Sequence, residues 1–326
     1  MTVLVTGGAG YIGGHVVDQL LATGERVVVV DDMTTGVRER LGGLPRLDVD
    51  LATSDAPAAL EAFMREHEVE AVVHFAAKKQ VGESVARPAW YYAQNMTGLA
   101  NVLLAMEAAG ARTLVFSSSA AVYGQGTGEP AREDDPCSPI NPYGETKLAG
   151  EWLVDAARRA GAVDAVSLRY FNVAGAASTR LADRFALNLV PMVFERLDRG
   201  EAPRVFGDDY PTVDGSCVRD YVHVVDLAAA HLAALAALRR GAPVSPALNV
   251  ATGRGYSVFE VLETIREVTG IPTPPVVEPR RPGDPAVLVA DPARIREELS
   301  WTASLGLRDM VESAWAARTA LREARV

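Results

Sequence analysis

The residues best suited to chemistry are a run of serines and a Tyr/Lys pair further along the chain. Ser117–Ser119 ends a segment rich in apolar residues, and Tyr143 and Lys147 lie in a helical pattern. A spacing of four residues places Tyr143 and Lys147 on one face of a helix. A phenol has a pKa of about 10, and a neighbouring ammonium group favours its deprotonated form. Lys147 could therefore prepare Tyr143 for proton transfer, while Ser119 hydrogen-bonds the same substrate oxygen.

A glycine-rich turn near the N-terminus predicts a phosphate-binding site. The segment Thr6–Gly13 reads TGGAGYIG and lies between the apolar strand pattern Val3–Val5 and a helical pattern. Glycines allow a tight turn and close approach of phosphate oxygens, and the free amides at a helix start favour negative charge. Because strand, turn and helix follow in the required order, we expect this turn to bind a dinucleotide. Tyr/Lys pairs also occur on solvated helices, so the interpretation of that pair depends on its occurrence together with this turn.

Two acidic residues end the next strand and indicate the type of dinucleotide. Asp31 and Asp32 follow the glycine turn by about 20 residues, where a carboxylate accepts hydrogen bonds from the adenosine ribose. A carboxylate in this place also repels a 2′-phosphate. We therefore expect NAD rather than NADP, provided that Arg38 does not reach the site and compensate the charge. Asp31 is the favoured ligand, whereas Asp32 could equally be an ordinary strand-end acid.

These residues need a scaffold in which strands alternate with helices. We expect strands at Thr2–Thr6, Arg26–Val30, Pro45–Val49, Ala71–Phe75, Thr113–Ser117 and Ala165–Tyr170. We expect helices at Gly13–Thr23, Ala56–His67, Trp90–Ala109 and Tyr143–Ala160. Continuous apolar strands separated by helices predict a parallel sheet that is covered on both faces. The predicted fold class is α/β, a Rossmann-like doubly wound parallel sheet, which binds ligands beyond the carboxyl ends of its strands.

The pattern changes after residue 172, where strands become shorter and Gly, Pro and Asp interrupt the helices more often. We expect residues 1–172 to form an NAD-binding Rossmann domain. Residues 173–326 should form a smaller mixed α/β substrate-binding lobe, with part of this stretch returning to the sheet. Helices are expected at Leu181–Arg199 and Ala228–Arg240. No flexible linker is evident, so the two parts should share one cleft.

Length and composition exclude several classes of protein. The 326 residues are 48% apolar, and 32 basic against 42 acidic side chains give a net charge of −10. An acidic chain is a poor general binder of nucleic acid or anionic membranes, and no apolar run is long enough for a transmembrane helix. Cys137 and Cys217 belong to no metal or redox motif and are interpreted as packing thiols in a reducing compartment. The N-terminus lacks the pattern of a secretory leader, so the expected location is the cytoplasm, and no metal is expected.

Several longer motifs resemble those of a known family. The stretches concerned are Thr6–Gly13, His74–Ser84, Phe116–Gly124, Tyr143–Lys147, Arg169–Asn172 and Asp209–Tyr221. With them, the chain resembles the extended short-chain dehydrogenase/reductases and, within that superfamily, the UDP-galactose 4-epimerase family. The first and fourth stretches mark the superfamily only, whereas the second and the last are more specific to the epimerases.

This resemblance implies roles for residues along most of the chain. It places NAD against Gly7, Gly10, Tyr11, Ile12, Gly13, Asp31, Asp32, Asp50, Leu51, Phe75, Ala76, Ala77, Lys79, Asn95, Ser117, Tyr143, Lys147 and Phe171. It places a UDP-sugar against Lys79, Ser119, Tyr143, Asn172, Asn188, Leu189, Arg219, Arg281, Asp284 and Leu288. The implied catalytic residues are Ser119, Tyr143 and Lys147.

The implied reaction is inversion at C4 of the sugar, which interconverts UDP-galactose and UDP-glucose. Tyr143, as a phenolate, takes the proton of the 4-hydroxyl while the C4 hydride passes to NAD. The 4-keto sugar then rotates about its diphosphate linkage, so that the hydride returns to the other face. Because each turnover regenerates the cofactor, NAD should be held tightly.

The chain also departs from related patterns. Ala120 and Ala121 stand where sugar-nucleotide dehydratases carry acidic residues, so elimination of water is disfavoured. The loop Ala174–Leu187 is shorter than is usual in the epimerases, which leaves the local sugar and uracil contacts open. Leu288 stands where many epimerases have a bulky Tyr, which could admit an N-acetyl group at C2 of the sugar, although Leu288 could equally serve packing alone.

Other functions remain open at this point. The substrate could be another nucleotide sugar, such as a UDP-pentose or a UDP-uronate. A non-catalytic NAD sensor of the same fold is a further alternative, but the intact Ser119, Tyr143 and Lys147 argue against it. The helices Trp90–Ala109 and Trp152–Arg159 resemble the pair through which such enzymes commonly dimerise, so a homodimer is expected.

Overall fold

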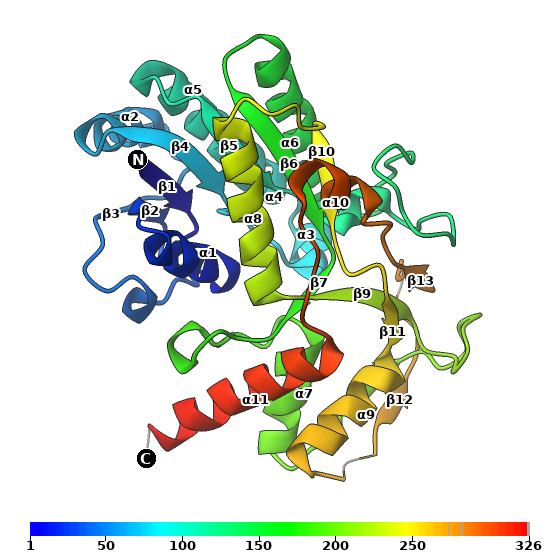
Figure 1. The fold of residues 1–326 in the computed structure, drawn as a ribbon. Helices are drawn as coiled ribbons and strands as arrows, with labels where there is room; N and C mark the ends of the chain where they lie inside the picture. The colour runs from blue at the N-terminus through cyan, green and yellow to red at the C-terminus, as the bar shows by residue number, and fades with distance from the viewer. Residues whose placement is uncertain (273, 282, 325–326) are drawn as a thin grey trace.

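A seven-stranded parallel sheet forms the centre of the computed structural model, which describes residues 1–272, 274–281 and 283–324. The strand order is β10-β6-β5-β4-β1-β2-β3, and all neighbouring strands are parallel. The strands are β1 (Thr2–Thr6), β2 (Arg26–Asp31), β3 (Arg46–Asp48), β4 (Val69–His74), β5 (Thr113–Ser117), β6 (Asp164–Tyr170) and β10 (Ala247–Val250). Because the chain moves outward from β1 in both directions, the sheet is doubly wound, which confirms the predicted fold class (Figure 1).

Helices cover both faces of this sheet because successive strand residues point to opposite sides. In β1, Val3 and Val5 pack in one buried cluster, whereas Leu4 packs in another on the opposite face. The first face is covered by α1 (Tyr11–Ala22), α8 (Val224–Arg239) and α10 (Ala293–Leu299). The second face is covered by α2 (Ala56–Glu66), α5 (Gly98–Ala109) and α6 (Pro142–Arg159). The strands are therefore buried on both sides, as their continuous apolar sequences predict.

A smaller lobe lies beyond the carboxyl ends of the strands (Figure 1). Its strands are β7 (Asn172–Ala174), β8 (Arg204–Phe206), β9 (Val218–His223), β11 (Gly255–Ser257), β12 (Val276–Glu278) and β13 (Val287–Leu288). Its helices are α7 (Leu189–Asp198), α9 (Val258–Thr269) and α11 (Leu307–Glu323). These helices share a buried cluster that includes Phe194, Ile265 and Met310. This lobe therefore has an apolar core of its own.

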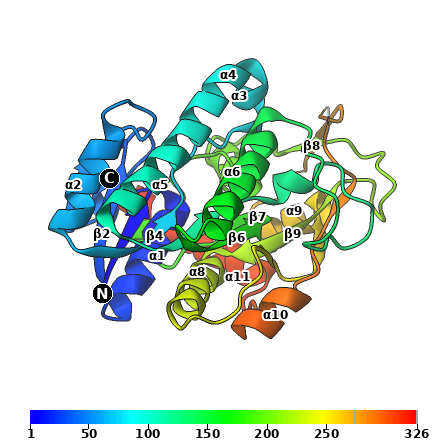
Figure 2. The same cartoon turned by 90° about the horizontal axis from the view of Figure 1, so that it is seen from above.

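Short helical segments complete the chain. They are η1 (Arg38–Arg40), α3 (Val81–Ala86), α4 (Pro88–Tyr92), η2 (Ala93–Thr97), η3 (Ala120–Tyr123) and η4 (Thr179–Leu181). Seen from above, α3, α4, α5 and α6 lie together on one side of the molecule (Figure 2). The segment η2 is a π-helical turn between α4 and α5, so the stretch expected as a single helix is interrupted there.

One expectation about an element is wrong in part. The helix expected at Leu181–Arg199 begins only at Leu189, because the Asp183 carboxylate accepts hydrogen bonds from the Phe185 amide (3.3 Å) and the Asn188 side chain (3.1 Å). These bonds hold residues 182–188 in a loop. Part of the chain beyond residue 172 returns to the sheet, whose seventh strand, β10, comes from residues 247–250. The helix α8, also from beyond residue 172, packs on the same sheet.

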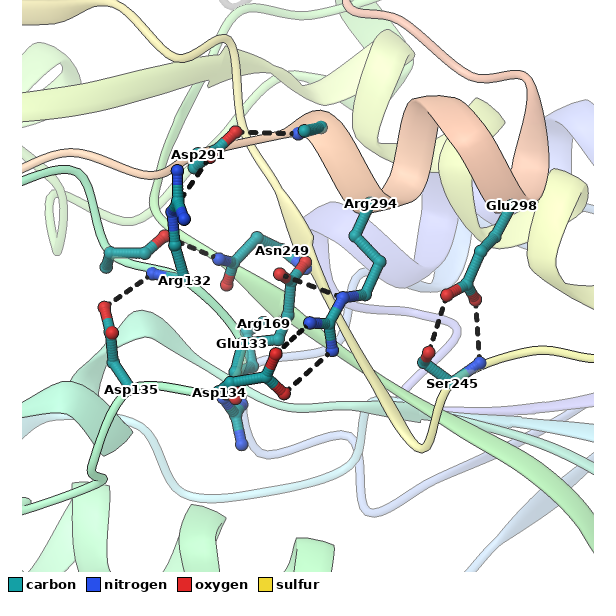
Figure 3. A network of polar contacts seen from close by, with 12 residues as sticks. Arg132, Glu133, Asp134, Asp135, Arg169, Ser245, Asn249, Asp291, Arg294 and Glu298 are labelled. Carbon is teal, nitrogen blue, oxygen red and sulfur yellow. Dashed lines mark hydrogen bonds and ion pairs between the residues drawn. The ribbon is translucent and has the colours of Figure 1, made fainter.

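A polar network fastens a long connection to the β10 edge of the sheet (Figure 3). The Asn249 amide donates to the Glu133 carboxylate (2.7 Å), and the Asn249 side chain donates to the Ala131 carbonyl (2.9 Å). Arg169 on β6 donates to the Glu133 carbonyl (3.1 Å), and Arg294 on α10 pairs with Asp134. The connection between β5 and α6 is thus tied to three elements of the large lobe.

Candidate active site

The glycine turn forms a cradle at the end of β1. Gly7 has a φ of +69°, and its amide donates to the Val30 carbonyl (2.7 Å), which holds the turn against β2. A Cβ on Gly13 would lie 2.3 Å from the Gly7 oxygen, so only glycine fits there. Helix α1 starts directly after Gly10, with no side-chain cap and no acid in its first turn. Its first amides are therefore available to an anion such as a pyrophosphate.

The two acids at the end of β2 have different environments. The Asp31 carboxylate accepts hydrogen bonds from the amides of Ala9 (3.0 Å) and Met33 (2.9 Å), and burial raises its pKa. Asp32 is paired with Lys78 (Nζ to Oδ2, 2.7 Å), and its pKa is lowered: burial works against this, but the bonds from Lys78 and Thr34 outweigh it. Arg38 pairs with Asp48 instead (3.0 Å) and does not line the cavity described next. Arg38 therefore does not compensate the charge of Asp31, which is the condition set above for binding NAD rather than NADP.

A cavity runs from the glycine turn across the carboxyl ends of β1, β2 and β4. It is lined by most of the positions predicted to hold the cofactor, namely Gly7, Gly10, Tyr11, Ile12, Gly13, Asp31, Asp32, Asp50, Leu51, Phe75, Ala76, Ala77, Lys79 and Asn95. The turn cradle, the open helix start and the carboxylate at the end of β2 all face one space. These residues fit a dinucleotide with its pyrophosphate on α1 and its adenosine ribose at Asp31.

Other residues of this cavity were not predicted. Lys78, Gln94 and Tyr170 line it, as do Asp183, Phe185 and Leu187 from the short loop before α7. Tyr170 ends β6 inside the matching stretch Arg169–Asn172 and could have been inferred from that position. The loop residues carry no comparable pattern, because their place depends on the path of the loop.

The π-helical turn η2 positions Asn95 beside the cavity. The Asn95 side chain accepts from the Lys78 amide (2.8 Å) and donates to the Lys78 carbonyl (3.0 Å) and to the Thr146 hydroxyl (3.0 Å). It thereby joins the loop after β4 to helix α6. The same helix carries Tyr143 and Lys147, so this contact fixes the cavity wall relative to those two residues.

Ser119, Tyr143 and Lys147 are brought together where β5 ends and α6 begins. Lys147 is 4% exposed, donates to the Ser117 carbonyl (2.8 Å) and lies with its Nζ 5.9 Å from the centre of the Tyr143 ring. Burial lowers the pKa of Lys147 to about 8. Burial raises the pKa of Tyr143, and a hydrogen bond with Ser119 opposes this effect. The site therefore holds a buried phenol and a buried amine close enough for the charge of one to affect the protonation of the other.

Two further predicted cofactor residues, Ser117 and Phe171, lie behind the cavity rather than on its wall. The Ser117 hydroxyl donates to the Tyr170 hydroxyl (2.8 Å), which places it one side chain away from the space. Phe171 is buried against Tyr123 in a cluster that also contains Leu148 and the partly buried Leu288. Neither Ser117 nor Phe171 lines the cavity in the structure, and neither do Tyr143 and Lys147.

The predicted substrate residues lie in two groups. Asn172 begins β7, and Asn188 caps α7 immediately before Leu189, with its side chain bonded to Asp183. The second group lies around β9 and β13. The Arg219 guanidinium on β9 is 3.8 Å from the Asp284 carboxylate, and Leu288 on β13 is the register partner of Arg219.

Arg281 lies over the Phe206 ring (3.8 Å) and completes this second group. The Cys217 thiol is a neighbour of this group that was not predicted. Burial and the charge of Asp284 raise the pKa of Cys217, whereas the charges of Arg219 and Arg281 lower it. None of Arg219, Arg281, Asp284 and Leu288 lines the cofactor cavity.

Across residues 1–272, 274–281 and 283–324, no three His, Cys, Asp or Glu side chains are grouped as metal ligands. In the same part of the chain, every helix is too short or too polar to cross a membrane.

A doubly wound sheet with a glycine turn, an acid at the end of β2 and a Ser/Tyr/Lys set defines a nucleotide-dependent oxidoreductase-like enzyme class. Comparison with known proteins agrees: the NAD dependent epimerase/dehydratase family matches residues 3–251. The UDP-glucose 4-epimerase of Corynebacterium glutamicum is 43% identical over 98% of this chain and 97% of its own. A crystal structure of the UDP-glucose 4-epimerase of Stenotrophomonas maltophila, with bound NAD and formylated UDP-arabinopyranose, has a TM-score of 0.93 and 38% identity, covering 99% of both chains.

A third relative is the UDP-Glc/GlcNAc 4-epimerase of Campylobacter jejuni, with a TM-score of 0.84, 35% identity and coverage of 98% of this chain and 99% of that one. The chain belongs to the NAD dependent epimerase/dehydratase family and, within it, to the UDP-glucose 4-epimerases. The predictions of family, of NAD as cofactor and of an epimerase rather than a non-catalytic sensor are confirmed at this level.

Proposed function

We propose that this chain catalyses the reversible, NAD-dependent epimerisation of a UDP-hexose at C4, with Ser119, Tyr143 and Lys147 as its catalytic residues. The observation that carries the proposal is the position of the buried Lys147 ammonium 5.9 Å from the Tyr143 ring, beside a cavity that fits a dinucleotide. NAD bound in that cavity would supply the acceptor and donor of a hydride at C4 of the sugar.

The chain's own residues move the proton. Tyr143, as a phenolate, would take the proton of the 4-hydroxyl. It would return this proton to the same oxygen after the 4-keto sugar has rotated. Lys147 would favour the phenolate because a nearby ammonium stabilises negative charge. The hydrogen bond with Ser119 opposes the burial that raises the pKa of Tyr143. Ser119 donates to the same sugar oxygen and orients it.

The second group of predicted residues supports the binding of a nucleoside diphosphate. Arg219 is only 12% exposed and is 3.8 Å from Asp284, so the acid only partly compensates its charge. We assign Arg219 and Arg281 to the diphosphate and Asp284 to the uridine ribose. Asn172 and Lys79 would contact the sugar nucleotide near the cofactor, and Asn188 with Leu189 would contact it at the start of α7.

A second candidate substrate is UDP-N-acetylglucosamine, because Leu288 offers less bulk than a tyrosine beside the Phe171 cluster. The Campylobacter jejuni relative is named as an epimerase of both UDP-Glc and UDP-GlcNAc. We therefore propose that some N-acetylated substrate is also accepted.

The surface of α3, α5 and α6 supports the proposal of a homodimer. Large apolar side chains are exposed there: Val81 (48%), Val85 (63%), Leu104 (55%) and Trp152 (65%). An exposed apolar patch on adjoining helices is typical of a protein interface. The free thiols of Cys137 and Cys217 agree with the proposed cytoplasmic location.

Replacement of Tyr143 by phenylalanine tests the assignment of the base. Loss of one hydroxyl removes the proton acceptor but leaves the cavity wall, so we expect turnover of UDP-galactose to fall by at least about 100-fold. NAD released by denaturing the purified variant should match the wild-type amount. Turnover at the wild-type rate by the variant would refute the role of Tyr143.

A further inference from the structure

Glu151 is a buried carboxylate on α6, one turn beyond Lys147 on the same helix face. Its Oε1 accepts a hydrogen bond from the Ser118 hydroxyl (2.5 Å). Arg169 on β6 forms a two-pronged ion pair with it, through Nε (2.9 Å) and Nη2 (2.6 Å). Glu151 and Arg169 are each 7% exposed at the side chain. Both carboxylate oxygens are therefore bonded to neighbouring strands.

The partners of Glu151 lie next to the catalytic set. Ser118 lies between Ser117 and Ser119 in the sequence. The Ser117 carbonyl accepts a hydrogen bond from the Lys147 ammonium. Arg169 directly precedes Tyr170, which lines the cofactor cavity and whose hydroxyl accepts a hydrogen bond from the Ser117 hydroxyl. One carboxylate thus joins α6 to the ends of β5 and β6 at the place where the reaction would occur.

Glu151 is the negatively charged group that acts on the Lys147 ammonium. His74, facing Lys147 from β4, has its pKa lowered by burial to about 3 and is neutral near pH 7. The phenol of Tyr143 lies on the same face of α6 as Lys147. Burial disfavours the Lys147 ammonium, and the negative charge of Glu151 opposes this effect.

The far side of Glu151 is bounded by groups from other elements. Arg169 extends past it to the Tyr123 hydroxyl (3.0 Å) and the Glu133 carbonyl (3.1 Å). Burial raises the pKa of both Glu133 and the nearby Cys137 thiol. Among these neighbours, Glu151 is the acid whose charge acts on Lys147.

We propose that Glu151 is a positioning residue for the epimerisation: it holds the end of β5 through Ser118 and keeps a negative charge one turn from Lys147. This rests on the proposed roles of Ser119, Tyr143 and Lys147. Without this charge the positive Arg169 would remain near the ammonium. Lys147 would then lose its proton at lower pH, and Tyr143 would lose the cation that favours its phenolate.

Glu151→Gln tests the charge, because glutamine keeps the side-chain length and an oxygen for Ser118. We expect kcat at pH 8 to fall about tenfold, with KM for UDP-galactose changed less than about twofold. The alkaline limb of the kcat profile should move to lower pH by about one unit. Asp155→Asn is the matched control: it removes an acid on the same helix that pairs with the surface residues Arg158 (2.8 Å) and Arg159 (3.1 Å). Its profile should match the wild type.

A second variant keeps the proposal testable if Glu151→Gln does not fold. Ser118→Ala leaves the ion pair intact but frees the end of β5, so kcat should fall about tenfold while the alkaline limb stays in place. A wild-type pH profile in Glu151→Gln, or a wild-type kcat in Ser118→Ala, would overturn this inference. Full activity of Tyr143→Phe would instead overturn the proposed function on which it rests.

Discussion

Replacing His231 by asparagine should make the protein more resistant to acid. His231 lies in α8, is 0% exposed and donates from Nδ1 to the Leu227 carbonyl (2.9 Å). Its Nε2 has no hydrogen-bond partner among the described residues, and its ring packs on Phe75 at the back of the cofactor cavity (4.7 Å). Burial lowers the pKa of His231 to about 4, so the folded protein holds this ring neutral.

The size of the effect follows from linkage between protonation and folding. In the unfolded chain a histidine has a pKa of about 6.5, so below that pH the unfolded state binds a proton that the folded state refuses. The free energy of unfolding is therefore lost as the pH falls from about 6.5 towards the folded value of about 4. Between pH 7 and pH 5, this single residue accounts for a loss of about 2 kcal/mol. His15 and His74, whose pKa values burial lowers to about 4 and about 3, act in the same direction.

Urea unfolding at pH 7 and pH 5 measures this directly. The difference in the free energy of unfolding between the two pH values should be smaller in His231→Asn than in the wild type by about 2 kcal/mol. Leu235→Ala, at a buried position of the same helix, is the control: it lowers stability at both pH values and leaves the difference unchanged. The same pH difference in His231→Asn and the wild type would refute the reasoning.

Two further substitutions test the cofactor turn and the sugar pocket. In Gly13→Ala the new Cβ would lie 2.3 Å from the Gly7 oxygen, so the turn must shift and the purified protein should contain less than about a tenth of the wild-type NAD. Gly43→Ala, which meets nothing within 4 Å, should retain NAD fully, and normal NAD in Gly13→Ala would contradict the turn's role. Leu288→Tyr should lower turnover of UDP-N-acetylglucosamine relative to UDP-glucose by about tenfold, because the ring fills space for the N-acetyl group. No N-acetyl turnover by the wild type, or an unchanged ratio in the variant, would end that proposal.

The features that could be predicted from the sequence are those whose chemistry is local. The glycine turn depends on consecutive residues, and the phenol and amine of Tyr143 and Lys147 share a helix face through their spacing alone. Strands β1 and β5 were also predicted with their observed bounds, because apolar runs between turn residues are short and distinct.

The features that were missed depend on contacts between distant segments. The segment before α7 was covered by two overlapping predictions, a loop at 174–187 and a helix from Leu181, because its apolar pattern does not reveal that Asp183 bonds to Asn188 and lines the cavity. The return of part of the later chain to the sheet was expected without naming the segment, and β10 pairs with β6 although β7, α7, β8, β9 and α8 lie between them in the chain. Glu151 carries no motif of its own, and its place is set by Ser118 and Arg169, which lie 33 and 18 residues away.

The most direct test of the account uses UDP-galactose that carries deuterium at C4. Incubated with the purified protein and no added cofactor, it should be converted to UDP-glucose that retains the deuterium at C4, because the hydride leaves the sugar and returns within one bound complex. Loss of the label to water, or no conversion by a protein that contains NAD, would contradict the central claim.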